Sequence, residues 1–156
     1  MFVIIMIIIN MAAILSIRFA RRKFNMLEIC AYWMLNCAVI QQVFTIITIN
    51  LQMIEVSEGV GVFWYLVMNR LVLMPSLIIW LFYFSKDVNI IRKAIFMGAW
   101  LLVLSGIQLL SKTFGMIAYV NWNVGYSLAE WFMVLFATTS FFLWFRHILK
   151  KEEFIV

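Results

Sequence analysis

Residues 62–84 read VFWYLVMNRLVLMPSLIIWLFYF, an apolar run in which Arg70 is the only charged residue. A helix needs about 20 predominantly apolar residues to cross the hydrocarbon core of a bilayer, and this run is long enough. Strands of a membrane barrel alternate between apolar and polar residues, whereas this run is continuously apolar. A helix also satisfies its backbone hydrogen bonds internally. The run therefore predicts a membrane-spanning helix.

Further apolar runs lie on both sides of this one, at about 2–17, 25–54, 94–111 and 125–145. The 156 residues are 67% hydrophobic and 12% charged, whereas a soluble domain has about 45–50% apolar and about 25% charged residues. We predict an all-α fold, a polytopic transmembrane bundle of five helices. It forms one membrane-embedded domain over residues 1–156, and its first segment is near the short limit for a full crossing.

Lys and Arg occur in alternate gaps between the apolar runs. Cytoplasmic loops carry an excess of these residues, so the pattern predicts an external N-terminus and a cytoplasmic C-terminus. A multi-pass membrane protein with the lipid bilayer as its partner follows. The net charge of +5 lies beside the ends of the apolar runs and forms no separate basic face, so no nucleic-acid partner is expected. Ten of the twelve cations are on the predicted cytoplasmic side: Arg18, Arg21, Arg22, Lys23, Lys86, Arg92, Lys93, Arg146, Lys150 and Lys151.

Polar side chains inside the predicted spans are costly in lipid and call for an explanation. Arg70 lies about 12 Å along its helix from the outer end, at 1.5 Å per residue, and Glu130 falls in the same outer half. Arg70 could extend to the headgroups, form a structural ion pair with Glu130, or line a path for a solute or ion. The wider cluster could line an outward-facing pocket or form hydrogen bonds between helices, worth about 0.6 kcal/mol each. This candidate polar cluster comprises Arg70, Glu130, Gln108, Lys112, Asn69 and Gln41.

Two further patterns concern helix packing and helix shape. Ala94, Gly98 and Gly106 form a small-residue face that favours close approach of another helix, within the chain or between copies. Pro75 predicts a kink in the third span, because proline donates no backbone hydrogen bond. No metal-protease, phosphate-binding or nucleophile-elbow motif occurs in the sequence. We therefore expect no catalytic residues, no cofactor and no metal.

Several short motifs carry a resemblance to a known family. They are the basic first loop Arg21-Arg22-Lys23, Glu55 at the end of the second run, Pro75 in the third run, and Ile117-Ala118-Tyr119 followed by Trp122. With these motifs the chain resembles the small multi-span membrane proteins of spore-forming Gram-positive bacteria. It departs from that pattern where Val56-Ser57-Glu58 replaces the usual proline and arginine, and where Gln108 replaces an acid. The resemblance implies a bacterial plasma membrane and supplies no activity.

Two functions from different classes remain open at this stage, with a lipid-modifying enzyme as a third option. The absence of catalytic motifs and of a soluble domain favours a non-enzymatic accessory, scaffolding or regulatory subunit. Such a subunit would act through helix–helix contacts with a membrane-protein partner or a second copy. The alternative is a small transporter or channel subunit for an anionic solute or lipid, in which the polar cluster forms the pocket.

Overall fold

The computed structural model describes residues 2–86 and 88–151, with side chains from residue 7 onward, and most of this part of the chain is helical. Two helices contain a π-helical turn, η1 after α2 and η2 between α3 and α4. The helical elements are α1 (Phe2–Ala20), α2 (Met26–Thr45), η1 (Ile46–Asn50), α3 (Val60–Met68), η2 (Asn69–Leu73), α4 (Met74–Ser85), α5 (Ile90–Thr113) and α6 (Val124–Lys151).

Four of these helical stretches are long and apolar enough to cross a bilayer: Met26–Asn50, Val60–Ser85, Ile90–Thr113 and Val124–Lys151. In helix α1 the stretch Ile7–Ala20 is apolar but shorter. The prediction of a helical fold with five helices is confirmed in the described residues. The number of crossings and the orientation stay predictions.

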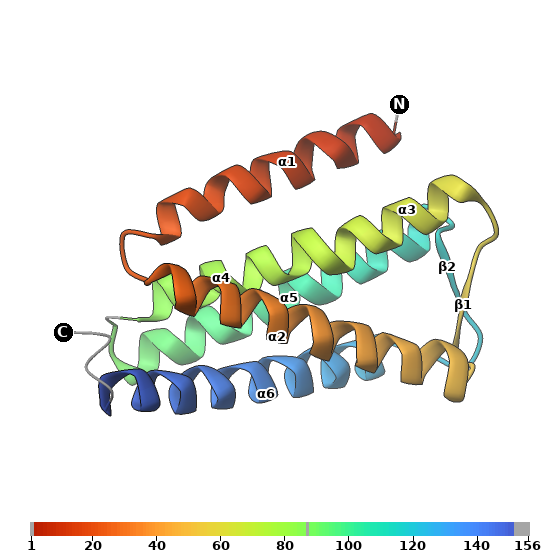
Figure 1. Cartoon of the computed structure of the whole chain (residues 1–156). Helices are drawn as coiled ribbons and strands as arrows, with labels where there is room; N and C mark the ends of the chain where they lie inside the picture. The colour runs from red at the N-terminus through yellow and green to blue at the C-terminus, as the bar shows by residue number, and fades with distance from the viewer. Residues whose placement is uncertain (1, 87, 152–156) are drawn as a thin grey trace.

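Helices α2, α3–α4, α5 and α6 form a four-helix bundle, and α1 lies outside it along α3–α4 (Figure 1). Helix α2 packs on α4 and α6, and α5 packs on the same two helices. Helices α4 and α6 are therefore diagonal to each other across the bundle. The indole Nε1 of Trp80 donates a hydrogen bond to Ser16 Oγ at 2.9 Å, which links α4 to α1.

The bundle core is filled by aliphatic and aromatic side chains. Ile78, Leu104 and Leu135 are each at most 1% exposed. The rings of Phe82 and Phe142 stack across the diagonal, with their centroids 4.4 Å apart. In a bilayer the lipid tails are as apolar as these side chains, so van der Waals contact between close-packed helices stabilises the bundle.

Large apolar side chains also cover the outside of the bundle. Met34 is 73% exposed and Ile90 is 81% exposed, and both belong to helices that could span a membrane. Soluble proteins rarely expose apolar surface on this scale, because it would draw the chains together in water. This surface matches a lipid environment.

The two ends of the bundle differ in composition (Figure 1). We call the end with the α1–α2 turn, the α4–α5 turn and the end of α6 the basic end, because the ten cations named above lie in or beside these segments. At the opposite end, β1 (Ile54–Val56) pairs antiparallel with β2 (Ile117–Tyr119), and Glu55 lies opposite Ala118. We call this the strand end.

The strand pair corrects the predicted boundaries. The second apolar run was expected to be helical to residue 54, but the helix ends at Asn50 and Ile54 is in a strand. Gln52 has a φ of 51°, in the left-handed region that a helix cannot continue through. Apolar residues alone could not reveal this turn. The other helices extend beyond the predicted runs, and the last continues through the basic segment to Lys151.

Pro75 lies two residues after the end of the π-helical turn η2. The N–H of Met74 bonds to the carbonyl of Asn69, five residues earlier. Proline has no N–H, so the carbonyl of Leu71 lacks its usual helical donor. The thiol of Cys37 on α2 donates to that carbonyl at 3.4 Å. The structure places a π turn before Pro75, and a neighbouring helix satisfies the freed carbonyl. The kink at Pro75 stays a prediction.

The small-residue face has no helix against it within the described chain. Ala94 and Gly98 are exposed. A Cβ added at Gly98 or Gly106 would meet nothing within 4 Å. Close packing on this face inside the chain is therefore wrong, because α5 turns other residues toward α4 and α6. Packing between copies stays a prediction.

Candidate functional site

A polar cavity opens at the strand end of the described chain. It has a volume of about 1010 Å³ and lies between α2–η1, α3, and the segment that carries β1. Its polar lining includes residues that the sequence marked as candidates together with several that it did not. These polar residues are Gln41, Thr45, Thr48, Gln52, Glu55, Ser57, Arg70 and Asn121. We call this cavity the Arg70 pocket.

Arg70 is half-buried and held by uncharged groups. Its Nε donates to the carbonyl of Leu66 at 3.1 Å, and its Nη1 donates to Gln41 Oε1 at 3.2 Å. The guanidinium carbon lies 3.7 Å from the ring centroid of Phe44. A guanidinium carries five N–H donors. Arg70 therefore keeps its full charge and has donors left for a carboxylate or phosphate, which it can bind through two hydrogen bonds at once.

Glu130 on α6 is bound on the opposite side of the core. Gln108 Nε2 on α5 donates to Glu130 Oε2 at 2.9 Å. Trp131 Nε1 in turn donates to Gln108 Oε1 at 3.0 Å. Gln108 is only 8% exposed, so these bonds replace those it would make with water. The three side chains form a network between α5 and α6.

The ion pair considered between Arg70 and Glu130 is not present among the described residues. Their helices are diagonal across the bundle, and each side chain bonds to a neighbouring helix instead. Both residues do line one small cavity of about 40 Å³, together with Asn69 and Gln108. A cavity of this size has room for about one water molecule.

The remaining two candidates lie in different surroundings. Asn69 is 4% exposed and its Oδ1 has no hydrogen-bond partner in the described structure. Lys112 lies apart from both cavities, with its Nζ 4.4 Å from the ring centroid of Tyr119. Burial raises the pKa of the Tyr119 hydroxyl, and the nearby charge of Glu130 raises that pKa further. Four of the six candidates are thus brought together around the small cavity, Gln41 joins them through Arg70, and Lys112 does not.

A buried carboxylate at the basic end had no role in the sequence analysis. Glu28 is 1% exposed and accepts the backbone N–H of Asn25 at 2.9 Å, which caps the start of α2. It also accepts the hydroxyl of Tyr32 at 3.4 Å. Its Oε1 lies 3.3 Å from Nε of Arg146, at the other end of the sequence. The spacing of Asn25 and Glu28 is that of a capping box and could have indicated the first contact, whereas the ion pair required the fold.

No protein-family model, no curated protein and no solved structure matches this chain. The described residues contain no group of three or more His, Cys, Asp or Glu that could hold a metal ion. The fold and the pocket define a helical bundle, with four helices able to cross a membrane and, at one end, a polar pocket whose lining includes Arg70 and Glu55.

Proposed function

We propose that this chain is a multi-span plasma-membrane protein with its basic end in the cytoplasm and its strand end outside. Ten of the twelve Lys and Arg lie at the basic end, and short cationic segments are retained on the cytoplasmic side. Helix α1 has 19 residues, which gives about 28 Å at 1.5 Å per residue. This length is close to the roughly 30 Å hydrocarbon core, so five crossings are proposed.

The orientation is tested with reporter fusions at both ends of the chain. A reporter that is active only in the cytoplasm should be active at the C-terminus and inactive at the N-terminus. Reporter activity at both ends would show an even number of crossings and would exclude an external N-terminus.

Within this setting we infer a non-enzymatic accessory or regulatory subunit that binds an anionic ligand in the Arg70 pocket. The observation that carries the inference is the Arg70 guanidinium, which lines the pocket and bonds only to uncharged groups among the described residues. The carboxylate of Glu55 lines the same pocket. A cation in a low-dielectric wall attracts an anion more strongly than the same cation in water. The ligand class is therefore a carboxylate or phosphate compound that enters from the strand end.

The transporter alternative needs a path through the bundle. Below the pocket, the core residues Ile78, Leu104 and Leu135 are at most 1% exposed, and they close the centre of the four helices. A single copy in this state would bind a ligand without conducting it. This favours binding over transport.

Binding is tested with the full chain in phosphatidylcholine nanodiscs, titrated by calorimetry with pyrophosphate and with citrate as probes. Arg70→Gln should weaken binding of the preferred probe by about tenfold or more, since one charge-assisted hydrogen bond is worth about 1.5–3 kcal/mol. Lys112→Gln is the matched control, because Lys112 is a cation toward the same end and does not line the pocket. Equal affinities for the two variants would place the anion elsewhere.

Two further measurements separate the accessory subunit from the transporter. Flux of the bound probe into proteoliposomes should equal that into empty vesicles. Flux above that level that Arg70→Gln abolishes would establish transport and overturn the accessory role. Purification from native membranes in mild detergent should yield a stoichiometric membrane partner, and a monodisperse monomer without one would contradict the proposal.

A further inference from the structure

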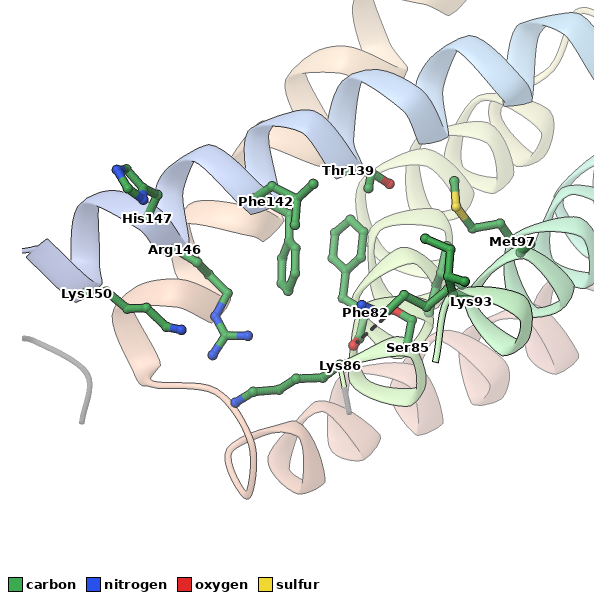
Figure 2. Close-up of a pocket in the computed structure, with 14 residues that line it drawn as sticks. Phe82, Ser85, Lys86, Lys93, Met97, Thr139, Phe142, Arg146, His147 and Lys150 are labelled. Atoms are coloured by element: carbon green, nitrogen blue, oxygen red, sulfur yellow. Dashed lines mark hydrogen bonds between the residues drawn. The ribbon is translucent and has the colours of Figure 1, made fainter. Parts of the chain in front are cut away.

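A second cavity lies at the basic end, between α4, α5 and α6, and has a volume of about 600 Å³ (Figure 2). We call it the basic groove. Its inner wall is apolar and includes Phe82, Met97 and Leu143. Lys86, Lys93, Arg146, His147 and Lys150 also line it. One cavity therefore combines an apolar wall with a concentration of positive charge.

Lys93 and Lys150 line the groove with no acidic side chain bound to them in the part of the chain that the structure describes. Of its described lining residues none is acidic. Glu28 contacts Arg146 from the α2 side, where it is buried beneath the guanidinium and also caps α2. In Figure 2, Lys86, Arg146 and Lys150 extend toward the same end of the groove, while His147 points away from them. Asp87, Glu152 and Glu153 lie outside the described residues.

The apolar part of the groove is continuous with the lipid-facing surface. Leu143 and Ile90 line the groove and are 62% and 81% exposed. A soluble phosphate compound would use the cations and leave this apolar wall uncovered. An amphiphile with an anionic headgroup would cover both parts at once, with its headgroup among the cations and its chain against the helices.

We propose that the basic groove binds one anionic phospholipid from the leaflet at the basic end. The lipid phosphate lies between Lys93 and Lys150, and an acyl chain runs along Met97 and Leu143. Juxtamembrane cations are attracted to anionic lipids, and each Lys ammonium has three N–H donors for phosphate oxygens. The site is separate from the Arg70 pocket and does not depend on the function proposed for it.

The charge requirement is tested with two matched pairs of substitutions in the full-length chain. Lys93→Gln with Lys150→Gln removes two cations that line the groove. Arg92→Gln with Lys151→Gln removes two exposed neighbours that do not. Each Lys near an anionic surface contributes roughly fivefold in affinity, so the first pair should weaken dioleoylphosphatidylglycerol binding by about 25-fold. Native mass spectrometry in a neutral detergent, with dioleoylphosphatidylcholine as reference lipid, measures the affinities.

The apolar requirement is tested without any change in charge. Ala94 lines the groove and is exposed, so Ala94→Trp should fill the apolar part and reduce phosphatidylglycerol binding while the helical content stays the same. Ala99→Trp is the matched control on the same helix, because Ala99 is exposed and does not line the groove. Equal phosphatidylglycerol binding by the two Trp variants would show that no acyl chain occupies the groove.

Three other outcomes would overturn the proposal. Equal losses in the two Gln pairs would show a diffuse attraction to the whole basic end. Equal affinity of the wild-type chain for phosphatidylcholine would remove the charge selectivity. Binding of sn-glycerol 3-phosphate as tight as that of phosphatidylglycerol would assign the groove to a soluble phosphate compound.

Discussion

Arg70, in the π-helical turn η2, and Arg146, near the basic end, are both half-buried cations beside an aromatic ring, yet their partners differ. Arg146 contacts the buried carboxylate of Glu28, at 3.3 Å, whereas Arg70 bonds to a backbone carbonyl and to the amide of Gln41. A cation on a buried carboxylate is largely neutralised and serves the fold. A cation among neutral groups keeps its charge and stays available to a ligand. The comparison separates a structural arginine from a candidate binding arginine.

The largest effect is expected from removal of the carboxylate at the basic end, which tests whether Arg146 is a structural arginine. Glu28→Gln leaves Arg146 without its anion, and its side chain is only 18% exposed. Loss of one partner from a buried ion pair lowers the free energy of unfolding by about 3 kcal/mol. Chemical unfolding in detergent micelles measures this change.

The control for Glu28 is Glu55→Gln, which alters an exposed carboxylate at the strand end and should change little. The double variant Glu28→Gln with Arg146→Met should recover part of the loss, because it removes the unpaired charge. A Glu28→Gln chain as stable as the wild type would show that Arg146 is not held by this pair.

Replacement of Arg70 should change the stability far less. Arg70→Met removes the charge and keeps an unbranched side chain against Phe44. An Arg within a span costs about 2.5–3.5 kcal/mol. The ring contact offsets about 2 kcal/mol of this cost, and the hydrogen bonds to Leu66 and Gln41 offset about 1.5 kcal/mol more. The unfolding free energy should therefore change by less than about 1 kcal/mol while the variant loses anion binding. Unfolding and calorimetric titration of the same sample measure both. A clear loss of stability would assign Arg70 to the fold.

The strand end itself can be weakened without touching either arginine. Gly115 precedes β2 with a φ of +69°, and its carbonyl accepts the hydroxyl of Ser57 at 2.5 Å. Alanine in this left-handed conformation costs about 1 kcal/mol. Gly115→Ala should therefore lower the stability by that amount, as measured by thermal unfolding.

Gly98→Ala is the control within a helix, where alanine gains about 0.5–1 kcal/mol over glycine. Nothing lies within 4 Å of an added Cβ there, so no clash offsets this gain. A destabilised Gly98→Ala chain, with a lower apparent mass in solution, would show that a second copy packs on this face.

The smallest expected effect on the free energy of unfolding comes from the hydrogen bond between Cys37 and Leu71, which lies between the two ends of the bundle. Cys37→Ala removes the thiol that donates to the carbonyl of Leu71, which should cost about 0.5 kcal/mol. In a Pro75→Ala background, the new N–H at position 75 can serve that carbonyl, so the cost should vanish. A double-mutant cycle of unfolding free energies measures the coupling. Identical costs in both backgrounds would mean that the thiol does not replace the missing donor.

Most of the helical architecture followed from the sequence, because long apolar runs leave the backbone few alternatives in lipid. The strand pair did not follow, since Ile54–Val56 and Ile117–Tyr119 are too short to show a pattern and pair across more than 60 residues of chain. The helix end at Asn50 depends on a left-handed Gln52, which composition does not encode. Helix boundaries were therefore less well predicted than helix existence.

The candidate cluster was predicted as a set of residues and not as a set of contacts. Depth in the membrane placed Arg70 and Glu130 in one half of the bundle, and the structure places both on one small cavity. Depth could not show which helices are neighbours. Gln41, which bonds Arg70, was marked for its polarity alone, and Glu28 escaped notice because it lies at the edge of an apolar run.

The sequence by itself determined that the chain forms apolar helices and that its cations gather at alternate turns, because both properties are local and depend on residue type and spacing. The tertiary structure alone decided that α4 and α6 are diagonal, that Arg70 bonds to α2, and that Glu28 meets Arg146. The physical reason is that pairing of helices depends on shape complementarity between whole faces, which many weak contacts set together. A single charged residue or proline does not indicate which helix packs against it.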